Sequence, residues 1–139
     1  MDYRIELVLV PVADVDRAKQ FYTETLGWNL DVDFSPNPDF RVVQITPPGS
    51  SCSITVGKGL TDAPAGCYKG THLVVKDITK AREELVSRGV AVSDIRHMGK
   101  EGWQPGVDPS HSDYASFADF ADPDGNTWIL QEVPVGKGA

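Results

Sequence analysis

Two segments of the chain show a β-rich apolar pattern that leads into a helical pattern. Residues 5–15 (IELVLVPVADV) contain Asp14 near their end, and residues 70–78 (GTHLVVKDI) contain Asp77 at the same place. An aspartate directly before an apolar stretch of helical period accepts hydrogen bonds from the free N–H groups of the first helical turn. The pattern therefore predicts the same transition from strand to helix twice.

The two predicted helices cover residues 15–26 and 78–88, and each ends at a glycine, Gly27 or Gly89. Glycine just past the last apolar position adopts the left-handed conformation that commonly ends a helix. Each helix carries one predicted buried stripe, made of Ala18, Tyr22, Thr25 and Leu26 in the first and of Ile78, Ala81, Leu85 and Val86 in the second.

Three strands are predicted after each helix. They cover residues 28–34, 40–46 and 51–56 after the first helix, and residues 90–96, 114–120 and 127–133 after the second. The Asp124–Gly125 pair before the last strand is a strong hairpin signal, because glycine accepts the positive φ of such turns. The acidic stretch 31–39 is interpreted as a solvated hairpin connection.

These elements predict an α+β fold built from two tandem βαβββ modules. The modules cover about residues 3–60 and 68–134 of a single domain, 1–139, with a linker around 57–69. Each helix covers one face of its sheet, so the eight strands are expected to curl into an open cup with the helices outside. The extra length of the second module lies in residues 97–113, which are rich in Gly, Pro, Ser and His.

Composition narrows the functional classes. The 139 residues are 40% hydrophobic and 24% charged, as in ordinary globular domains, and 20 acidic against 13 basic residues give a net charge of −7. Such a chain repels phosphate backbones, so nucleic acid is not an expected partner. No apolar run reaches the roughly 20 residues of a membrane span. The N-terminus MDYRIELVLV lacks the features of a signal peptide, so we expect a cytoplasmic protein whose Cys52 and Cys67 are reduced.

Two motifs resemble the vicinal oxygen chelate superfamily. They are PVADVDRAKQFYTETLGW near the start and DPDGNTWILQE near the end, and the resemblance extends over residues 4–133. This superfamily includes glyoxalase I, extradiol dioxygenases, fosfomycin-resistance enzymes and bleomycin-binding proteins. The resemblance implies a cup that takes a small molecule and, by analogy with the bleomycin-binding branch, a homodimer. A shared fold leaves the reaction open, because function resides in the site.

The resemblance also implies where a divalent metal would bind. Its ligand positions, in the first and last strand of each module, fall on Leu7, Ser53, Gly70 and Ile129. Leu, Gly and Ile offer no donor and a serine hydroxyl is a poor ligand, so no metal cofactor is expected. A divalent metal is not excluded, because an alignment shift of two positions would select His72 and Gln131 beside Leu9 and Thr55.

The ligand positions that the resemblance implies, the positions two residues further along the same strands, and the long loop give the candidate ligand-binding residues. They are Leu7, Leu9, Ser53, Thr55, His72, Trp103, Tyr114 and Gln131. Among them His72 is the candidate acid or base, and its alternative interpretation is a partly buried histidine bonded to a backbone carbonyl. Cys52 alternates toward the helix side and is interpreted as a core residue.

Three interpretations of the loop at 97–114 stay open. It contains His97, Trp103, His111 and Tyr114, and it could be a lid that brings an aromatic residue and two histidines over the mouth of the cup, or a solvated surface loop. It could also form an unconventional metal site from His97 and His111 with Asp108 or Asp113.

The sequence is compatible with three functions. The first is a metal-independent small-molecule binding protein of the glyoxalase and bleomycin-resistance type. The alternative is a lyase or isomerase of glyoxalase type, with His72 as acid/base or with a non-standard metal site. The third is an interaction module, which the polar residues Ser53, Thr55 and His72 disfavour because a partner-covered face is more apolar. The sequence does not decide whether the protein is an enzyme.

Overall fold

The computed structural model describes residues 1–135, which fold as two compact units. The first unit comprises Met1–Tyr68 together with Asp122–Asn126, and the second comprises Lys69–Ala121 and Thr127–Val135. The turn Asp122–Asn126 lies in the predicted second module in sequence but belongs to the first unit in space.

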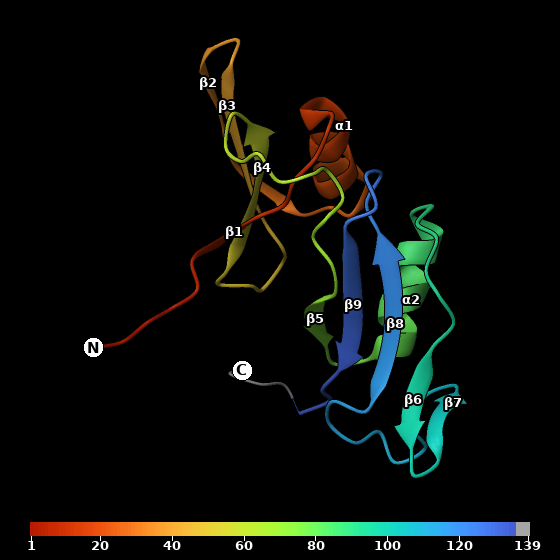
Figure 1. Ribbon diagram of the computed structural model, residues 1–139. Helices are drawn as coiled ribbons and strands as arrows, with labels where there is room; N and C mark the ends of the chain where they lie inside the picture. The colour runs from red at the N-terminus through yellow and green to blue at the C-terminus, as the bar shows by residue number, and fades with distance from the viewer. Residues whose placement is uncertain (136–139) are drawn as a thin grey trace. The chain divides into compact units, whose positions relative to one another are not determined.

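The first unit is a βαβββ module with a four-stranded sheet (Figure 1). Its strands lie in the order β1-β4-β3-β2, with β1 parallel to β4 and the other pairs antiparallel. Its elements are β1 (Leu7–Leu9), α1 (Val15–Gln20), a π-helical turn η1 (Phe21–Thr25), β2 (Asn29–Asn37), β3 (Phe40–Thr46) and β4 (Ser53–Lys58).

One face of this sheet and the helix form a buried core. Alternate residues of β3 and β4 are buried to 3% exposure or less, as are Ala18 and Tyr22 of the helical segment. The buried strand residues are Val43, Ile45, Ile54 and Val56. Because strand side chains alternate, their neighbours in sequence lie on the opposite face, which the helix does not cover.

The second unit repeats this plan around a five-stranded sheet (Figure 1). Its order is β5-β9-β8-β6-β7, with β5 parallel to β9, and Ile78, Ala118, Phe120, Trp128 and Leu130 are buried. Its elements are β5 (Thr71–Val75), α2 (Ile78–Ser87), β6 (Arg96–Gly99), β7 (Gly102–Pro105), β8 (Ser116–Ala121) and β9 (Thr127–Glu132).

The predicted helix ends are confirmed. The Asp14 carboxylate accepts a 3.1 Å hydrogen bond from the backbone N–H of Arg17, and Asp77 accepts one of the same length from Lys80. Gly27 and Gly89 have φ values of 75° and 87°, the left-handed conformation expected after a helix. The predicted α+β fold of two βαβββ modules is therefore confirmed, with one difference in strand number.

That difference lies in the long segment after α2. No strand covers residues 90–95; β6 begins at Arg96, and β6 and β7 form a hairpin within the segment predicted to be loop. Residues 1–135 thus contain nine strands instead of eight. In the segment 90–95 the Arg82 guanidinium donates to the carbonyls of Val92 and Ser93. The hydrogen bonds of this segment to β8 are those of Ser93, whose N–H donates to the Asp119 carbonyl and whose hydroxyl accepts from the Asp119 N–H.

Three smaller predictions are also corrected. The acidic stretch 31–39 is exposed and contains the turn of the β2–β3 hairpin at 38–39, as predicted, but residues 31–37 belong to β2 and not to the connection. Val86 is 47% exposed, since α2 buries a narrower stripe than its sequence pattern indicates. Cys52 is half-buried and not in the core; both cysteines carry free thiols. No helix among residues 1–135 is both long and apolar enough to cross a membrane.

Candidate functional site

The uncovered face of the first sheet gathers four of the predicted ligand-binding residues. Parallel pairing sets Leu7 beside Ser53 and Leu9 beside Thr55, and antiparallel pairing sets Gln44 beside Thr55. We call this surface the first face; it comprises Leu7, Leu9, Val32, Phe34, Gln44, Thr46, Ser53 and Thr55. Leu7, Val32 and Phe34 on it are exposed.

Thr55 on the first face has a buried hydroxyl without a partner. The residue is 4% exposed, and its Oγ1 makes no hydrogen bond in the described part of the chain. A buried hydroxyl that loses its hydrogen bonds costs free energy on the order of 1–3 kcal/mol. Such an atom is expected where a ligand or an ordered water completes the site.

Ser53, two residues earlier on the same strand, belongs to a chain of hydroxyl groups that ends at a carboxylate. Its Oγ lies 2.6 Å from Thr46 Oγ1, and the Thr46 hydroxyl donates to Asp31 of β2. Asn29 donates to the other Asp31 oxygen at 2.6 Å. The hydrogen bond from Thr46, followed by those from Asn29 and Gln44, lowers the pKa of Asp31 despite some desolvation. Asp31 is therefore an ionised acceptor at neutral pH.

The uncovered face of the second sheet carries aromatic and imidazole groups. We call it the second face; it comprises His72, Val74, Arg96, Met98, Trp103, Phe117, Asp119, Ile129 and Gln131. The Trp103 ring meets Phe117 edge-on at 5.4 Å between ring centroids and is 51% exposed. The Arg96 guanidinium lies 5.0 Å from the centre of the Trp103 ring and pairs with Asp119 at 3.0 Å. This exposed ring is a suitable surface for stacking a flat ligand.

On the second face His72 and Gln131 are bonded to each other, and Gln131 is also bonded to the loop between β7 and β8. His72 Nδ1 lies 2.8 Å from Gln131 Oε1, and Gln131 Nε2 donates to the Tyr114 carbonyl at 3.1 Å. The Gln131 side chain is thus held at both ends. His72 is therefore bonded to the Gln131 side chain and not, as its alternative interpretation expected, to a backbone carbonyl.

The loop that follows β7 is anchored at Glu132, a residue that is 1% exposed. His111 Nδ1 lies 2.9 Å from Glu132 Oε1, and the backbone N–H of Tyr114 donates to the Glu132 carbonyl. His111 and Tyr114 have φ values of 48° and 66°, which are unfavourable for residues with a Cβ. Only backbone atoms of Tyr114 make these contacts, and its side chain is 43% exposed.

The hypothetical metal site in this loop is not formed. His97 Nδ1 lies 2.8 Å from the Gly106 carbonyl, whereas His111 is bonded to Glu132. Within residues 1–135, no group of three or more His, Cys, Asp or Glu side chains is arranged to hold a metal ion. The loop histidines instead contribute to local structure.

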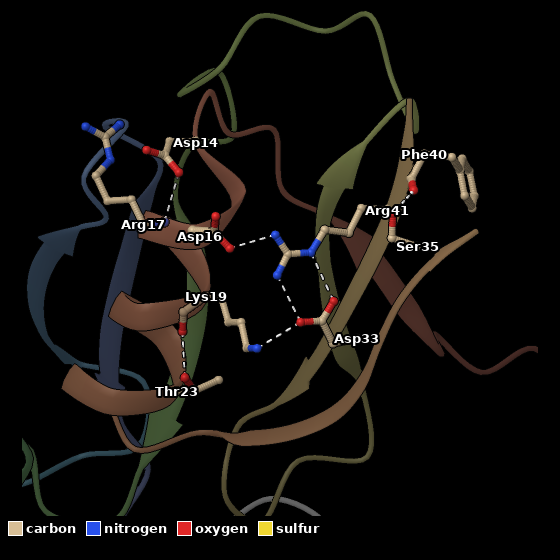
Figure 2. A network of polar contacts seen from close by, with 9 residues as sticks. All are labelled: Asp14, Asp16, Arg17, Lys19, Thr23, Asp33, Ser35, Phe40 and Arg41. Atoms are coloured by element: carbon tan, nitrogen blue, oxygen red, sulfur yellow. Dashed lines mark hydrogen bonds and ion pairs between the residues drawn. The ribbon is translucent and has the colours of Figure 1, made fainter. Parts of the chain in front are cut away.

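Sequence reasoning missed a third feature, a pocket on the helix side of the first unit. Its volume is about 620 Å³, and its lining includes Asp14, Asp16, Ser35, Arg41 and Lys58. Figure 2 shows Arg41 between Asp16 at 2.7 Å and Asp33 at 2.9 Å, with Lys19 also reaching Asp33 at 2.8 Å. Because Arg41 is already paired with two carboxylates, it serves to join α1 to β2 and β3 and is not available to bind an anion.

The predicted site residues thus separate by unit. Leu7, Leu9, Ser53 and Thr55 lie together on the first face; His72, Trp103 and Gln131 lie on the second face, and Tyr114 lies in the adjoining loop. Sequence reasoning missed Asp31 and Thr46, which lie at the first face, and Phe117, which lies on the second face. Pairing between strands brings these residues to the faces, and no local sequence motif marks that pairing. The sequence signal that could have found Asp31 is the alternation of Val32 and Phe34 with Asp31 and Asp33, because it places Asp31 within the predicted strand 28–34.

Comparisons with known proteins agree with this architecture. Residues 4–130 match the Glyoxalase/Bleomycin resistance protein/Dioxygenase superfamily. The chain belongs to this superfamily. It is 31% identical to TnmS3, described as an antibiotic binding protein from Streptomyces sp. CB03234, with 94% of this chain and 96% of that chain covered at a TM-score of 0.72.

Two further solved structures are similar to this superfamily member. A glyoxalase/bleomycin resistance protein from Streptomyces sp. CB03234 is 32% identical, with 93% and 100% of the two chains covered and a TM-score of 0.70. A superfamily member from Sphaerobacter thermophilus DSM 20745 is 27% identical, with 95% and 98% covered and a TM-score of 0.73.

The donor chemistry of this chain does not fit the divalent metal that the superfamily resemblance implies. Of the four implied positions, Leu7, Gly70 and Ile129 carry no donor atom. The fourth, Ser53, is engaged by Thr46 at 2.6 Å. One neutral hydroxyl does not hold a divalent ion, for which carboxylate, imidazole or thiolate groups are the usual protein ligands.

Proposed function

We propose that this protein binds small aromatic molecules on the uncovered faces of its two sheets, each face taken by itself, and sequesters them without a divalent metal. The observation that carries the proposal is the Thr55 hydroxyl, which is buried and unpartnered on a face that also exposes Leu7, Val32 and Phe34. Polar atoms that lack a partner, set among apolar side chains, are typical of ligand sites. The similarity to an antibiotic binding protein supports an antibiotic-like ligand.

We extend the proposal to assembly and location, with a homodimer in the cytoplasm as the working form. The homodimer rests on the bleomycin-binding branch that the sequence resembles. Sedimentation equilibrium of the purified protein tests it, and a monomer at micromolar concentration would contradict it. The segment 97–114 stays a candidate lid over a molecule bound on the second face, since its Tyr114 carbonyl accepts from Gln131, which adjoins His72.

The second candidate function is a lyase or isomerase of glyoxalase type. One observation favours it: the His72 ring is exposed, and its Nδ1 faces Gln131 while its Nε2 is left for a substrate proton. A base at this position would abstract a proton next to a carbonyl. Recovery of the bound compound unchanged after prolonged incubation would favour sequestration over this alternative.

The proposal predicts that His72→Ala and Gln131→Ala weaken ligand binding without unfolding the protein. The probes are aromatic antibiotics that include doxorubicin and tetracycline, with binding followed by calorimetry and by quenching of tryptophan fluorescence. Loss of one hydrogen-bonding group is expected to reduce affinity about threefold to tenfold. The same titrations with EDTA present are expected to give unchanged affinities.

His97→Ala is the matched control, because His97 is bonded to a backbone carbonyl of the hairpin and lies off the proposed face. It is expected to retain the affinity of the parent protein. Equal affinities for all three variants and the parent, with lower melting temperatures for His72→Ala and Gln131→Ala, would assign those two residues a structural role only. Absence of binding by the whole panel would remove the proposed function.

A further inference from the structure

The hydrogen-bond chain on the first face has a fixed direction. A carboxylate only accepts hydrogen bonds, so the single Thr46 hydroxyl proton is committed to Asp31. The 2.6 Å contact between Thr46 and Ser53 still requires a proton between the two oxygens. Ser53 must supply it, and the Ser53 oxygen is then left with lone pairs and no proton for a ligand.

The hydrogen bonds on the second face, which involve other residues, also have a fixed direction and also leave an acceptor for a ligand. The Tyr114 carbonyl only accepts, so the NH₂ group of Gln131 must point to it, and Gln131 Oε1 must point to His72. His72 Nδ1 is therefore the donor in their 2.8 Å contact. In the neutral imidazole the proton sits on Nδ1, and Nε2 presents a lone pair.

We infer that each face selects ligands that donate hydrogen bonds, specifically aromatic compounds with phenolic hydroxyl groups, because Ser53 on the first face and His72 on the second face are both oriented as acceptors. This inference rests on the proposed function and names the chemical class of its ligand. Exposed Trp103 on the second face and Phe34 on the first supply apolar surface for the aromatic body. On either face, a ligand edge that carries only acceptors would meet a lone pair, that of Ser53 on the first face or that of His72 on the second.

The direct test compares three probes that share one ring system. 2-Naphthol donates a hydrogen bond, 2-methoxynaphthalene has the donor blocked, and 2-naphthoate presents only anionic acceptors. We expect 2-naphthol to bind about fivefold more tightly than its methyl ether, in line with one net hydrogen bond. The carboxylate is expected to bind most weakly.

Asp31→Asn tests the cause of this preference. The new amide can donate to Thr46, which frees the Thr46 proton for Ser53 and the Ser53 proton for a ligand. The preference for 2-naphthol over the ether is expected to fall in Asp31→Asn, in which His72 on the second face is unchanged. It is expected to persist in full in Asp39→Asn, an exposed control with the same charge change in the same hairpin. Thr46→Val interrupts the chain by another route and is expected to lower the preference as well.

The tautomer of His72 gives a measurement that needs no ligand. Nitrogen-15 chemical shifts of the neutral ring, recorded at about pH 8, are expected to show the Nδ1–H form. Free histidine favours the other tautomer, so an Nε2–H ring would overturn the inference for the second face. Equal affinity of 2-naphthol and its ether would overturn the inferred preference for hydrogen-bond donors and leave the proposed function in place. If none of the probes bound, both the inference and the proposed function would be overturned.

Discussion

At the scale of single residues, the unpartnered hydroxyl of Thr55 lowers the stability of the free protein and belongs to the proposed ligand-binding site. Its Oγ1 is buried without a partner, whereas the otherwise similar Thr127 accepts a 2.8 Å hydrogen bond from the backbone N–H of Gly70. A polar atom left unsatisfied in the folded state destabilises the protein until a ligand satisfies it. This is the trade between stability and function expected of a binding site.

We predict that Thr55→Val raises the free energy of unfolding of the free protein by about 1 kcal/mol, because the methyl group replaces an unsatisfied hydroxyl of nearly the same shape. Ligand affinity is expected to fall in the same variant. Thr127→Val is the control and is expected to lower the free energy of unfolding, since it removes a satisfied acceptor. Urea denaturation measures all three proteins, and a destabilised Thr55→Val would indicate that the hydroxyl is bonded in solution.

At the scale of elements, Arg41 joins three parts of the first unit. It lies in β3, pairs with Asp16 of α1, and binds Asp33 of β2 through two of its nitrogens (Figure 2). The guanidinium of Arg41, and after it the ammonium of Lys19, hold the pKa of Asp33 well below its ordinary value of 3.8. The paired carboxylates raise the pKa of Arg41 in turn.

This network predicts a specific loss of stability in acid. Because the pKa of Asp33 is lower in the folded than in the unfolded chain, its contribution is complete above the unfolded value and declines as the pH falls below about 4. Asp33→Asn is expected to lower the free energy of unfolding by about 1 kcal/mol at neutral pH and to have a smaller effect near pH 2. Urea denaturation midpoints between pH 7 and about pH 2 measure this change in the free energy of unfolding.

Asp39→Asn is the control, because the Asp39 side chain is exposed, and it should change the free energy of unfolding little at either pH. An equal loss for Asp33→Asn at both pH values would rule out the ion pairs as its source.

At the scale of the whole molecule, the first unit depends on a turn that comes from the second half of the sequence. The buried Asp122 carboxylate accepts hydrogen bonds from the Tyr22 hydroxyl at 2.7 Å and from Asn126 at 2.8 Å. Asn126 also donates to the Pro11 carbonyl, and Asp124 pairs with Arg17 at 3.0 Å. Without this turn, buried polar groups of the first unit would lose their partners.

We therefore predict that a fragment of residues 1–68 does not fold on its own, although it contains every helix and strand of the first unit. Its ¹H–¹⁵N spectrum is expected to show the narrow dispersion of an unfolded chain, whereas the full chain shows a dispersed one. A fragment that includes the Asp122–Asn126 turn through a short engineered linker is the control and should recover dispersion. A well-dispersed spectrum of residues 1–68 alone would contradict the prediction.

The sequence by itself determined the features that depend on neighbouring residues. The helix caps at Asp14 and Asp77, the helix ends at Gly27 and Gly89, and the strand 40–46 follow from local hydrogen bonding, backbone freedom and alternation. Repetition of that local pattern is also what identified the fold. Period-two alternation placed Leu7, Leu9, Ser53 and Thr55 on one face for the same reason.

Only the tertiary structure decided the features that join distant residues. Arg82 binds the carbonyls of Val92 and Ser93, which precede β6, and the turn at Asp122 completes a core a hundred residues earlier in the chain. The direction of the chain from Ser53 through Thr46 to Asp31 depends on three strands held in register. A hydrogen bond has a direction only once its donor and acceptor are in place, so the polarity of the site exists in the fold and not in any segment of the sequence.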